Sequence, residues 1–366
     1  RAQLQATLSS GVNVVLQASN DITLNSGAGL AVNNTGGDGG DLTLQAGRSV
    51  VLNAAVSTDN GDLTIVANER ASAGVVDAHR AAGDAVLQTA SINAGTGAVR
   101  LTINDGAGLT NSSGGDMTLA ALTAGAVILE NLATSGGDII LNGVIAGSIG
   151  ATPIVIAAGD GALINNVGAG VLDAGAGRWL IYAGAHADIT ANGLSANPFY
   201  NTLYNPAAPT TLGAAGNRFV FELAPTLTVT ADDATRVYGD ANPSVGYAIT
   251  GLVGGDTLAG AVQGAAEITI DAALDADVGA YATLAALGTL ASDYNYGFSF
   301  TPGVFTITQR AITVTADDLT RIYGDADPAL THQVTAGNLV FGDTLSGALA
   351  RAGGENVGDY AILQGT

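Results

Sequence analysis

The pentapeptide Gly40-Asp41-Leu42-Thr43-Leu44 closes the stretch GGDGGDLTL (residues 36–44) and recurs through the first half of the chain. Successive copies begin 21, 22, 32 and 22 residues further on, so most steps have the length of one full coil of a solenoid. The repeat therefore predicts a stack of similar coils. The later copies are GDLTI (61–65), GDAVL (83–87), GDMTL (115–119) and GDIIL (137–141).

Each copy alternates apolar and polar or small residues, which is typical of a short strand with one buried face. Leu42 and Leu44 are expected to point inward and Thr43 outward. Turn residues follow every run, and Gly and β-branched residues interrupt any helical period. One coil cannot bury its apolar face alone, so stability must come from stacked neighbours. We predict a parallel β-helix over residues 1–178.

The same stretch satisfies most of the calcium-binding nonapeptide GGxGxDxUx, in which U is a large apolar residue. Thr43 occupies the U position, and no second copy follows nine residues later, although neighbouring turns of that motif share each ion. Gly and Asp also favour tight turns. We interpret Asp41 as a corner residue, with calcium binding as the alternative.

The composition excludes several classes of function. The 366 residues contain no Cys and no Lys, and the net charge is −21, which argues against disulfides, thiolate or lysine chemistry, and nucleic-acid binding. Residues 139–159 carry no charge but include four Gly and Pro153, so strands explain them better than a membrane-spanning helix. Arg1 begins no signal peptide, and we expect a fragment or processed product.

Aromatic residues divide the chain. None occurs before Trp179, and all 18 lie from that position onward. We place a domain boundary after residue 178 and assign residues 179–224 to an aromatic-rich segment that covers the last coil, since an uncovered coil exposes apolar core and strand edges.

The GGDLTL…LNA rhythm of the first part resembles the filamentous-haemagglutinin-like exoproteins of two-partner secretion, whose stalks are right-handed parallel β-helices. The segments GRWLIYAG (177–184), NPFYNTLYN (197–205) and GNRFVFELAPTLTV (216–229) resemble the junction that ends the helix in many of those adhesins. The resemblance implies export through an outer-membrane secretion partner and folding outside the cell.

The last third of the chain contains two similar copies of one sequence. LTVTADDATRVYGDANP (227–243) returns as ITVTADDLTRIYGDADP (312–328), a step of 85 residues. The first copy closes with NYGFSFTPGVFTIT (295–308), whereas the second stops at Thr366 before that strand, so the chain is expected to be cut within a domain. These repeats resemble the MBG, or YDG-type, modules of bacterial adhesins, which implies tandem, mostly-β, β-grasp-like domains over residues 225–309 and 310–366.

Two sets of residues are candidate binding sites. Carboxylates cluster beside an arginine in each repeat, where they suit either surface ion pairs or calcium. These acidic residues are Asp232, Asp233, Asp240, Asp317, Asp318 and Asp325. Trp179, Tyr200 and Tyr204 are either structural or a platform for polysaccharide.

We find no catalytic residues. The three histidines lie in three different regions, and HExxH, GxSxG and P-loop motifs do not occur. The predicted β-helix lacks the aromatic residues with which β-helical lyases and hydrolases hold sugars. We expect a non-enzymatic stalk of a secreted bacterial surface adhesin that attaches cells to a surface or biofilm matrix. A polysaccharide-binding module and a self-assembling filament, formed end to end or laterally, are the alternatives.

Overall fold

A computed structural model describes residues 1–366 except 71, 107–112 and 135. The chain divides into two compact units. The first contains residues 1–226, 252–262 and 292–297, and the second contains the remainder. Nearly all regular structure is β, as predicted, and no helix in the described ranges is long and apolar enough to cross a membrane.

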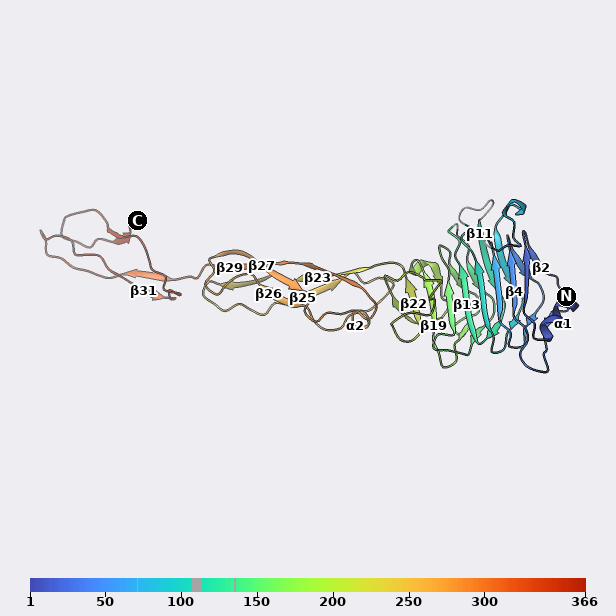
Figure 1. The fold of residues 1–366 in the computed structure, drawn as a ribbon. Coiled ribbons are helices and arrows are strands. Elements are labelled where there is room, and N and C mark those ends of the chain that lie inside the picture. Colours follow the sequence, from blue (N-terminus) through green and yellow to red (C-terminus); the bar gives the residue numbers. More distant parts are fainter. Residues whose placement is uncertain (71, 107–112, 135) are drawn as a thin grey trace. The chain divides into compact units, whose positions relative to one another are not determined.

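The first unit is a stack of parallel strands in three sheets (Figure 1). Sheet A has the order β1 (Val14–Ala18), β4 (Leu42–Ala46), β7 (Leu63–Ala67), β10 (Ala98–Ile103), β13 (Ala126–Asn131), β16 (Ile154–Ala157), β19 (Trp179–Ala183), β22 (Arg218–Phe221) and β21 (Asn197–Phe199). Sheet B has the order β2 (Ile22–Leu24), β5 (Val50–Leu52), β8 (Ala85–Thr89), β11 (Gly114–Leu119), β14 (Ile139–Leu141), β17 (Leu163–Asn165) and β20 (Ile189–Thr190). Sheet C has the order β18 (Leu172–Asp173), β15 (Ile145–Gly147), β12 (Leu122–Ala124), β9 (Ile92–Asn93), β6 (Val56–Ser57) and β3 (Leu30–Ala31).

Equivalent residues of successive coils stand in register and form the predicted aliphatic columns. Except in the first coil, where Leu16 is 37% exposed, their side chains belong to one continuous core. Each aliphatic side chain buried there contributes about 1.5–3 kcal/mol. The parallel β-helix prediction is confirmed. One column of sheet A consists of Leu16, Leu44, Ile65, Leu101, Leu129, Ile156, Ile181 and Phe219.

Four of the five aspartates of the recurring Gly-Asp motif accept a backbone N–H from the next coil and so link neighbouring coils. The Asp62 backbone N–H donates to Asp41 Oδ1 at 2.9 Å, and the Ala98 N–H donates to Asp62 Oδ1 at 2.7 Å. At another corner the Asp138 N–H donates to Asp116 Oδ1 at 2.9 Å. A carboxylate that accepts a backbone N–H makes a strong, charge-assisted hydrogen bond. This ladder accounts for the recurrence of Asp without a metal.

The glycines of the same motif allow the corners to stack closely. A β carbon on Gly61 would lie 2.5 Å from the Gly40 carbonyl oxygen. A β carbon on Gly161 would lie only 1.9 Å from the Gly137 carbonyl oxygen. No side chain fits between these backbones.

The stack continues beyond the predicted boundary at residue 178. β19 pairs with β16 in the same parallel register, and β22 pairs with β19. Trp179 therefore sits at an interior position of a regular strand and contacts Phe219, with ring centroids 5.4 Å apart. The aromatic pair fills the last coils from within, so residues 179–224 are not a separate lid.

The other end of the stack carries helix α1 (Ala2–Ser9), which the sequence pattern did not predict. Its Leu8 is fully buried in the core, and Leu4 packs against that core. A cavity of about 390 Å³ remains between α1 and the interior of the first coils. Two short 3₁₀ helices, η1 (Asp77–His79) and η2 (His186–Asp188), interrupt the coils.

The second unit contains small antiparallel and mixed sheets. Its first part combines a three-stranded sheet, β25-β23-β28, with a four-stranded sheet, β24-β29-β27-β26. Its second part contains the strand pairs β30–β31 and β32–β33. The bounds are β23 (Thr226–Ala231), β24 (Ala234–Val237), β25 (Tyr247–Thr250), β26 (Glu267–Ile270), β27 (Gly279–Ala286), β28 (Gly297–Thr301), β29 (Gly303–Thr308), β30 (Thr313–Ala316), β31 (His332–Ala336), β32 (Leu349–Arg351) and β33 (Ile362–Gln364). The short helix α2 (Leu258–Ala261) belongs to the first unit.

Candidate functional site

The most deeply buried charge of the β-helical unit is Glu130, on the outward side of β13. Its side chain is 0% exposed. Arg100 on β10 donates to both carboxylate oxygens, at 2.9 and 2.8 Å, and Thr102 Oγ1 donates at 2.9 Å. The hydroxyl of Tyr204 donates a further hydrogen bond to the same carboxylate. Each carboxylate oxygen of Glu130 therefore accepts two hydrogen bonds.

Tyr204 brings the segment between β21 and β22 over the outer face of sheet A. A second apolar cluster forms there, built from Val155, Leu180 and Tyr182 among others, with Tyr204 packed against it. The rings of Tyr182 and Tyr204 lie 4.9 Å apart. Burial, together with the bond to Glu130, raises the pKa of the Tyr204 hydroxyl. Tyr204 thus stays a neutral donor.

A second buried polar cluster surrounds Tyr200. Its hydroxyl donates to Asp256 Oδ2 at 2.7 Å, and the Tyr296 hydroxyl donates to the same oxygen, also at 2.7 Å. The Nε2 atom of His186 lies 2.7 Å from the Tyr200 oxygen. Because the Tyr200 proton points to Asp256, His186 Nε2 is the donor in that contact. Burial, followed by the carboxylate of Asp256, raises the pKa of Tyr200.

Backbone contacts tighten this cluster. The Tyr200 N–H donates to the Tyr294 carbonyl at 2.9 Å, and Asn295 Nδ2 donates to the Tyr200 carbonyl at 2.8 Å. The His186 ring stacks near Phe221, 4.1 Å between centroids, and leaves no room for a β carbon on Gly254. Segments 252–262 and 292–297 are folded into the β-helical unit through these contacts.

His186 gives this cluster a pH dependence. Burial lowers its pKa from the ordinary value of 6.5, and Asp256 opposes that shift. The unfolded chain therefore binds the proton more readily, and stability is lost as the pH falls through 6.5 toward the folded value. We expect the thermal midpoint of wild type to fall more than that of His186→Asn between pH 7.5 and 5. His79 and His332 are present in both the wild-type protein and the variant, so their contributions to the pH dependence cancel. An equal fall of the thermal midpoint in the two proteins would contradict the prediction.

The aromatic residues for which polysaccharide contact was the alternative to a structural role serve packing in this structure. Trp179 is 3% exposed and Tyr200 is 0% exposed, while Tyr204 is half-buried against Tyr182. Neither Trp179 nor Tyr200 presents a free ring face on which a sugar could stack. Polysaccharide binding stays a prediction, without support from these positions.

The acidic residues for which calcium binding was the alternative to ion pairs are not brought together. Asp233 Oδ1 accepts the Val304 N–H at 2.6 Å, and Asp240 pairs with Arg310. Asp317 accepts from Thr331 and Gln333 at 2.7 and 2.8 Å. Over the described part of the chain, no three His, Cys, Asp or Glu side chains are placed to hold a metal ion. Asp232 and Asp325 accept hydrogen bonds through their backbone carbonyls, from Thr283 and Arg321 respectively. Asp318 follows Asp317 in the sequence.

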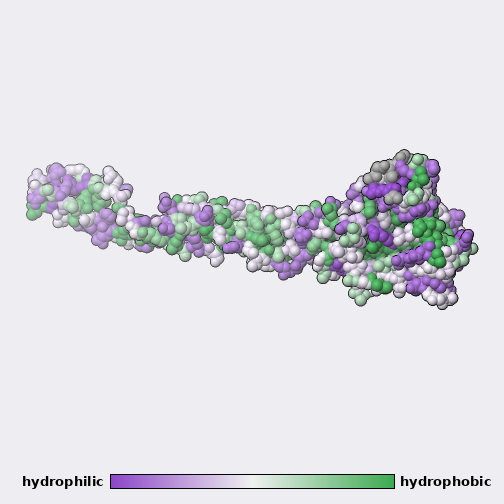
Figure 2. All heavy atoms as spheres, viewed as in Figure 1, coloured by the Kyte–Doolittle hydropathy of each residue, from purple (hydrophilic) through white to green (hydrophobic). Residues whose placement is uncertain are grey.

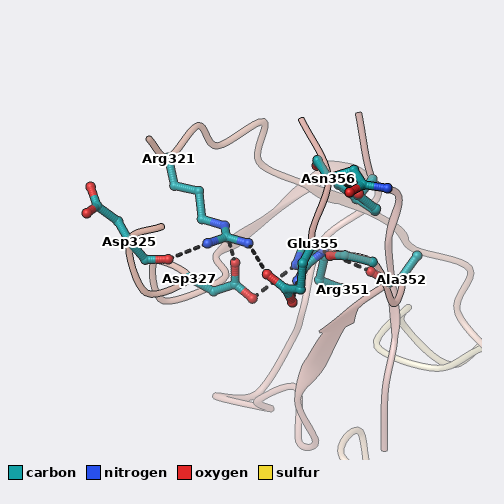
Figure 3. A network of polar contacts seen from close by, with 9 residues as sticks. Arg321, Asp325, Asp327, Arg351, Ala352, Glu355 and Asn356 are labelled. Atoms are coloured by element: carbon teal, nitrogen blue, oxygen red, sulfur yellow. Dashed lines mark hydrogen bonds and ion pairs between the residues drawn. The ribbon is translucent and has the colours of Figure 1, made fainter. Parts of the chain in front are cut away.

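A network of four charges joins distant segments of the second unit instead (Figure 3). Arg321 Nε lies 2.8 Å from Asp327 Oδ1, and its Nη2 lies 2.7 Å from Glu355 Oε2. Arg351 binds the same two carboxylates at 3.0 and 3.1 Å. Burial is partial, with Arg321 23% exposed, so the network contributes modestly to stability and mainly fixes geometry.

Sequence reasoning missed Glu130 and Asp256. Glu130 had a local signal, because it is the one charged residue in the strand AVILEN (126–131). Asp256 had no local signal in the sequence, because its partners Tyr200 and Tyr296 are 56 and 40 residues away.

The strand pattern and the repeat of the second unit agree with a comparison against protein-family models. Residues 227–306 and 312–366 match the MBG domain (YGX type). The end of the chain therefore carries two MBG domains, a repeat module of adhesin-like surface proteins. The match begins close to the predicted starts at 225 and 310. Searches of curated proteins and of solved structures gave no significant match.

Proposed function

We propose that this chain is a non-enzymatic stalk segment of a large secreted adhesin of the two-partner-secretion type. It would stand on the outside of a Gram-negative outer membrane, after export by its secretion partner. The observation that carries the proposal is the unbroken parallel register of sheet A from Val14 to Phe219. Aliphatic side chains fill most of the interior of these coils, and strand pairing joins each coil only to its neighbours, as expected of a spacer.

The surface chemistry supports the same function. A net charge of −21 disfavours lateral association of stacked strands, and two MBG domains follow the β-helix as further repeat modules. We infer that the regions that contact a host surface or matrix polysaccharide are displayed by this segment, and that binding strength does not depend on the identity of any single coil.

Removal of one coil tests this function. Deleting residues 42–62 joins Asp41 to Leu63 and restores the Gly-Asp-Leu-Thr corner, because Leu42 and Leu63 occupy the same register position. In the full-length protein on its producing cell, we expect the deletion to leave attachment to a surface within about twofold of wild type. Circular dichroism of the purified segment establishes that the shortened stack is folded.

Two results would overturn the proposal. One is loss of attachment by a coil-deleted protein that is folded and exported at the wild-type level. The other is release of reducing or unsaturated sugars from a polysaccharide panel by the intact chain, since that would identify an enzyme.

A further inference from the structure

One turn recurs in both MBG domains with the same conformation. The first turn is VGGD (253–256), and the second turn is VFGD (340–343). In each, the aspartate N–H donates to the carbonyl of the valine three residues earlier, at 3.0 and 2.9 Å. The two central residues of each turn have positive φ, between 54° and 85°. Left-handed conformations at both central positions are typical of a type I′ turn.

The first turn contacts the coils of the β-helical unit. Asp256 accepts from the hydroxyl of Tyr200, which directly follows β21. Gly254 lies against the His186 ring, where an added β carbon would be only 2.3 Å from Cε1. Segment 252–262 belongs to the same compact unit as these partners, although the MBG match covers residues 227–306. The turn therefore attaches the first MBG domain to the module that precedes it in the chain.

The second turn makes a matching contact with the first MBG domain, within the second compact unit. Tyr238, directly after β24, packs edge to face on Phe341, with ring centroids 5.7 Å apart and ring planes at 82°. Asp343 and Tyr238 line one cavity of about 280 Å³. Burial and the neighbouring Asp343 carboxylate raise the pKa of Tyr238, so its hydroxyl stays protonated as a donor to that carboxylate.

Phe341 is held in a backbone conformation that its side chain disfavours. Its φ is +54°, in the left-handed region that glycine adopts readily and bulky residues rarely do. The first turn has Gly254 at this position, so the turn itself does not require an aromatic residue. The ring contact with Tyr238 offsets the strain, since such outliers persist only where their surroundings impose them.

Further contacts around Tyr238 hold the same two domains together. Arg310, between the two matched ranges, donates to the Tyr238 carbonyl at 2.7 Å and pairs with Asp240. Its Nη1 atom donates to Asn338 Oδ1 at 3.3 Å. Figure 2 shows hydrophobic and hydrophilic residues intermixed over the visible face of this unit. The contacts between the domains are likewise mixed, because they combine an aromatic pair with charged and amide groups.

We propose that the V-x-G-D turn is the docking element by which each MBG domain attaches to the module before it. The aspartate accepts a hydrogen bond from a tyrosine hydroxyl of that module, Tyr200 in one case and Tyr238 in the other. The residue before the glycine fits the turn to its partner, since glycine leaves room for the His186 ring whereas phenylalanine meets the Tyr238 ring. Such docking limits the motion between linked domains, whatever surface the protein attaches to.

Distances between spin labels test the docking of the second domain. The chain contains no cysteine, so Thr269→Cys and Gln364→Cys place one label on an exposed strand position of each MBG domain. In the whole 366-residue chain, double electron–electron resonance should give one narrow distance distribution. Phe341→Gly should widen it about twofold, because the ring contact is lost while the turn itself is relieved of strain. Asp343→Ala should widen it to a similar extent.

The equivalent tyrosine of the second domain provides the matched control. Tyr323 is 72% exposed, so Tyr323→Ala should leave the distribution at its original width. Circular dichroism of each variant establishes that the domains are folded.

A reciprocal exchange tests the first turn. Gly254→Phe puts a side chain where the His186 ring lies, although the second turn shows that its conformation accepts phenylalanine. With labels at Thr190→Cys and Thr269→Cys, we expect a wider distribution than in the labelled parent. Asp256→Ala should have the same effect.

Three outcomes would overturn the proposal. They are a broad distribution in either labelled parent, an unchanged width in Phe341→Gly or Gly254→Phe, and equal widening by the control Tyr323→Ala. Because no adhesion is measured, these outcomes are independent of the proposed role as a stalk.

Discussion

Replacement of Glu130 by alanine is expected to destabilise the β-helical unit by about 1–3 kcal/mol. The carboxylate is fully buried and accepts from Arg100, Thr102 and Tyr204 at once. Its removal leaves a guanidinium and two hydroxyl groups without their acceptor on the outer face of sheet A. The segment that Tyr204 anchors should loosen at the same time.

Urea unfolding followed by circular dichroism and tyrosine fluorescence measures this effect. Glu222→Ala, which removes an exposed glutamate, is the matched control and should change stability by less than about 0.5 kcal/mol. A double-mutant cycle with Tyr204→Phe should give a coupling energy of about 1 kcal/mol or more. If Glu130→Ala and Glu222→Ala unfold at the same urea concentration, the buried network has no energetic role.

Gly161→Val is expected to disrupt the stack more severely than any other glycine replacement in the last coils. Its β carbon would lie 1.9 Å from the Gly137 carbonyl oxygen and 2.6 Å from the carbonyl carbon. Both atoms belong to the backbone of the preceding coil and cannot rotate away. The two coils must separate, which costs at least about 3 kcal/mol and breaks the pairing of β14 with β17.

Gly170→Val is the matched control for this replacement. Gly170 lies in the same coil and has an ordinary φ, and a β carbon added there would have no other atom within 4 Å beyond its own chain neighbours. We expect its thermal midpoint to stay within about 2 °C of wild type, whereas Gly161→Val should lower the midpoint by about 6 °C or more. Similar midpoints for the two variants would refute close corner stacking.

The sequence predicted the β-helix well because its signals are local and repeat. The alternation in Leu42-Thr43-Leu44 and the Gly-Asp corner recur with each coil, so one motif explains many elements. The aromatic segment was predicted less well. Trp179 proved to be an interior residue, since β19 simply extends sheet A. The Tyr200 cluster joins residues from four separate segments, and no local sequence pattern predicts that these residues are in contact.

The sequence by itself determined the inward columns, the corner residues and the two MBG repeats, because periodic burial and turn chemistry are properties of short segments. Only the tertiary structure decided which short segments become strands. ATRV (234–237) forms β24 through parallel pairing with β29, in which Ala234 lies opposite Phe305 and Val237 lies opposite Thr308. A strand exists through the hydrogen bonds that its neighbour provides, and that neighbour is distant in sequence.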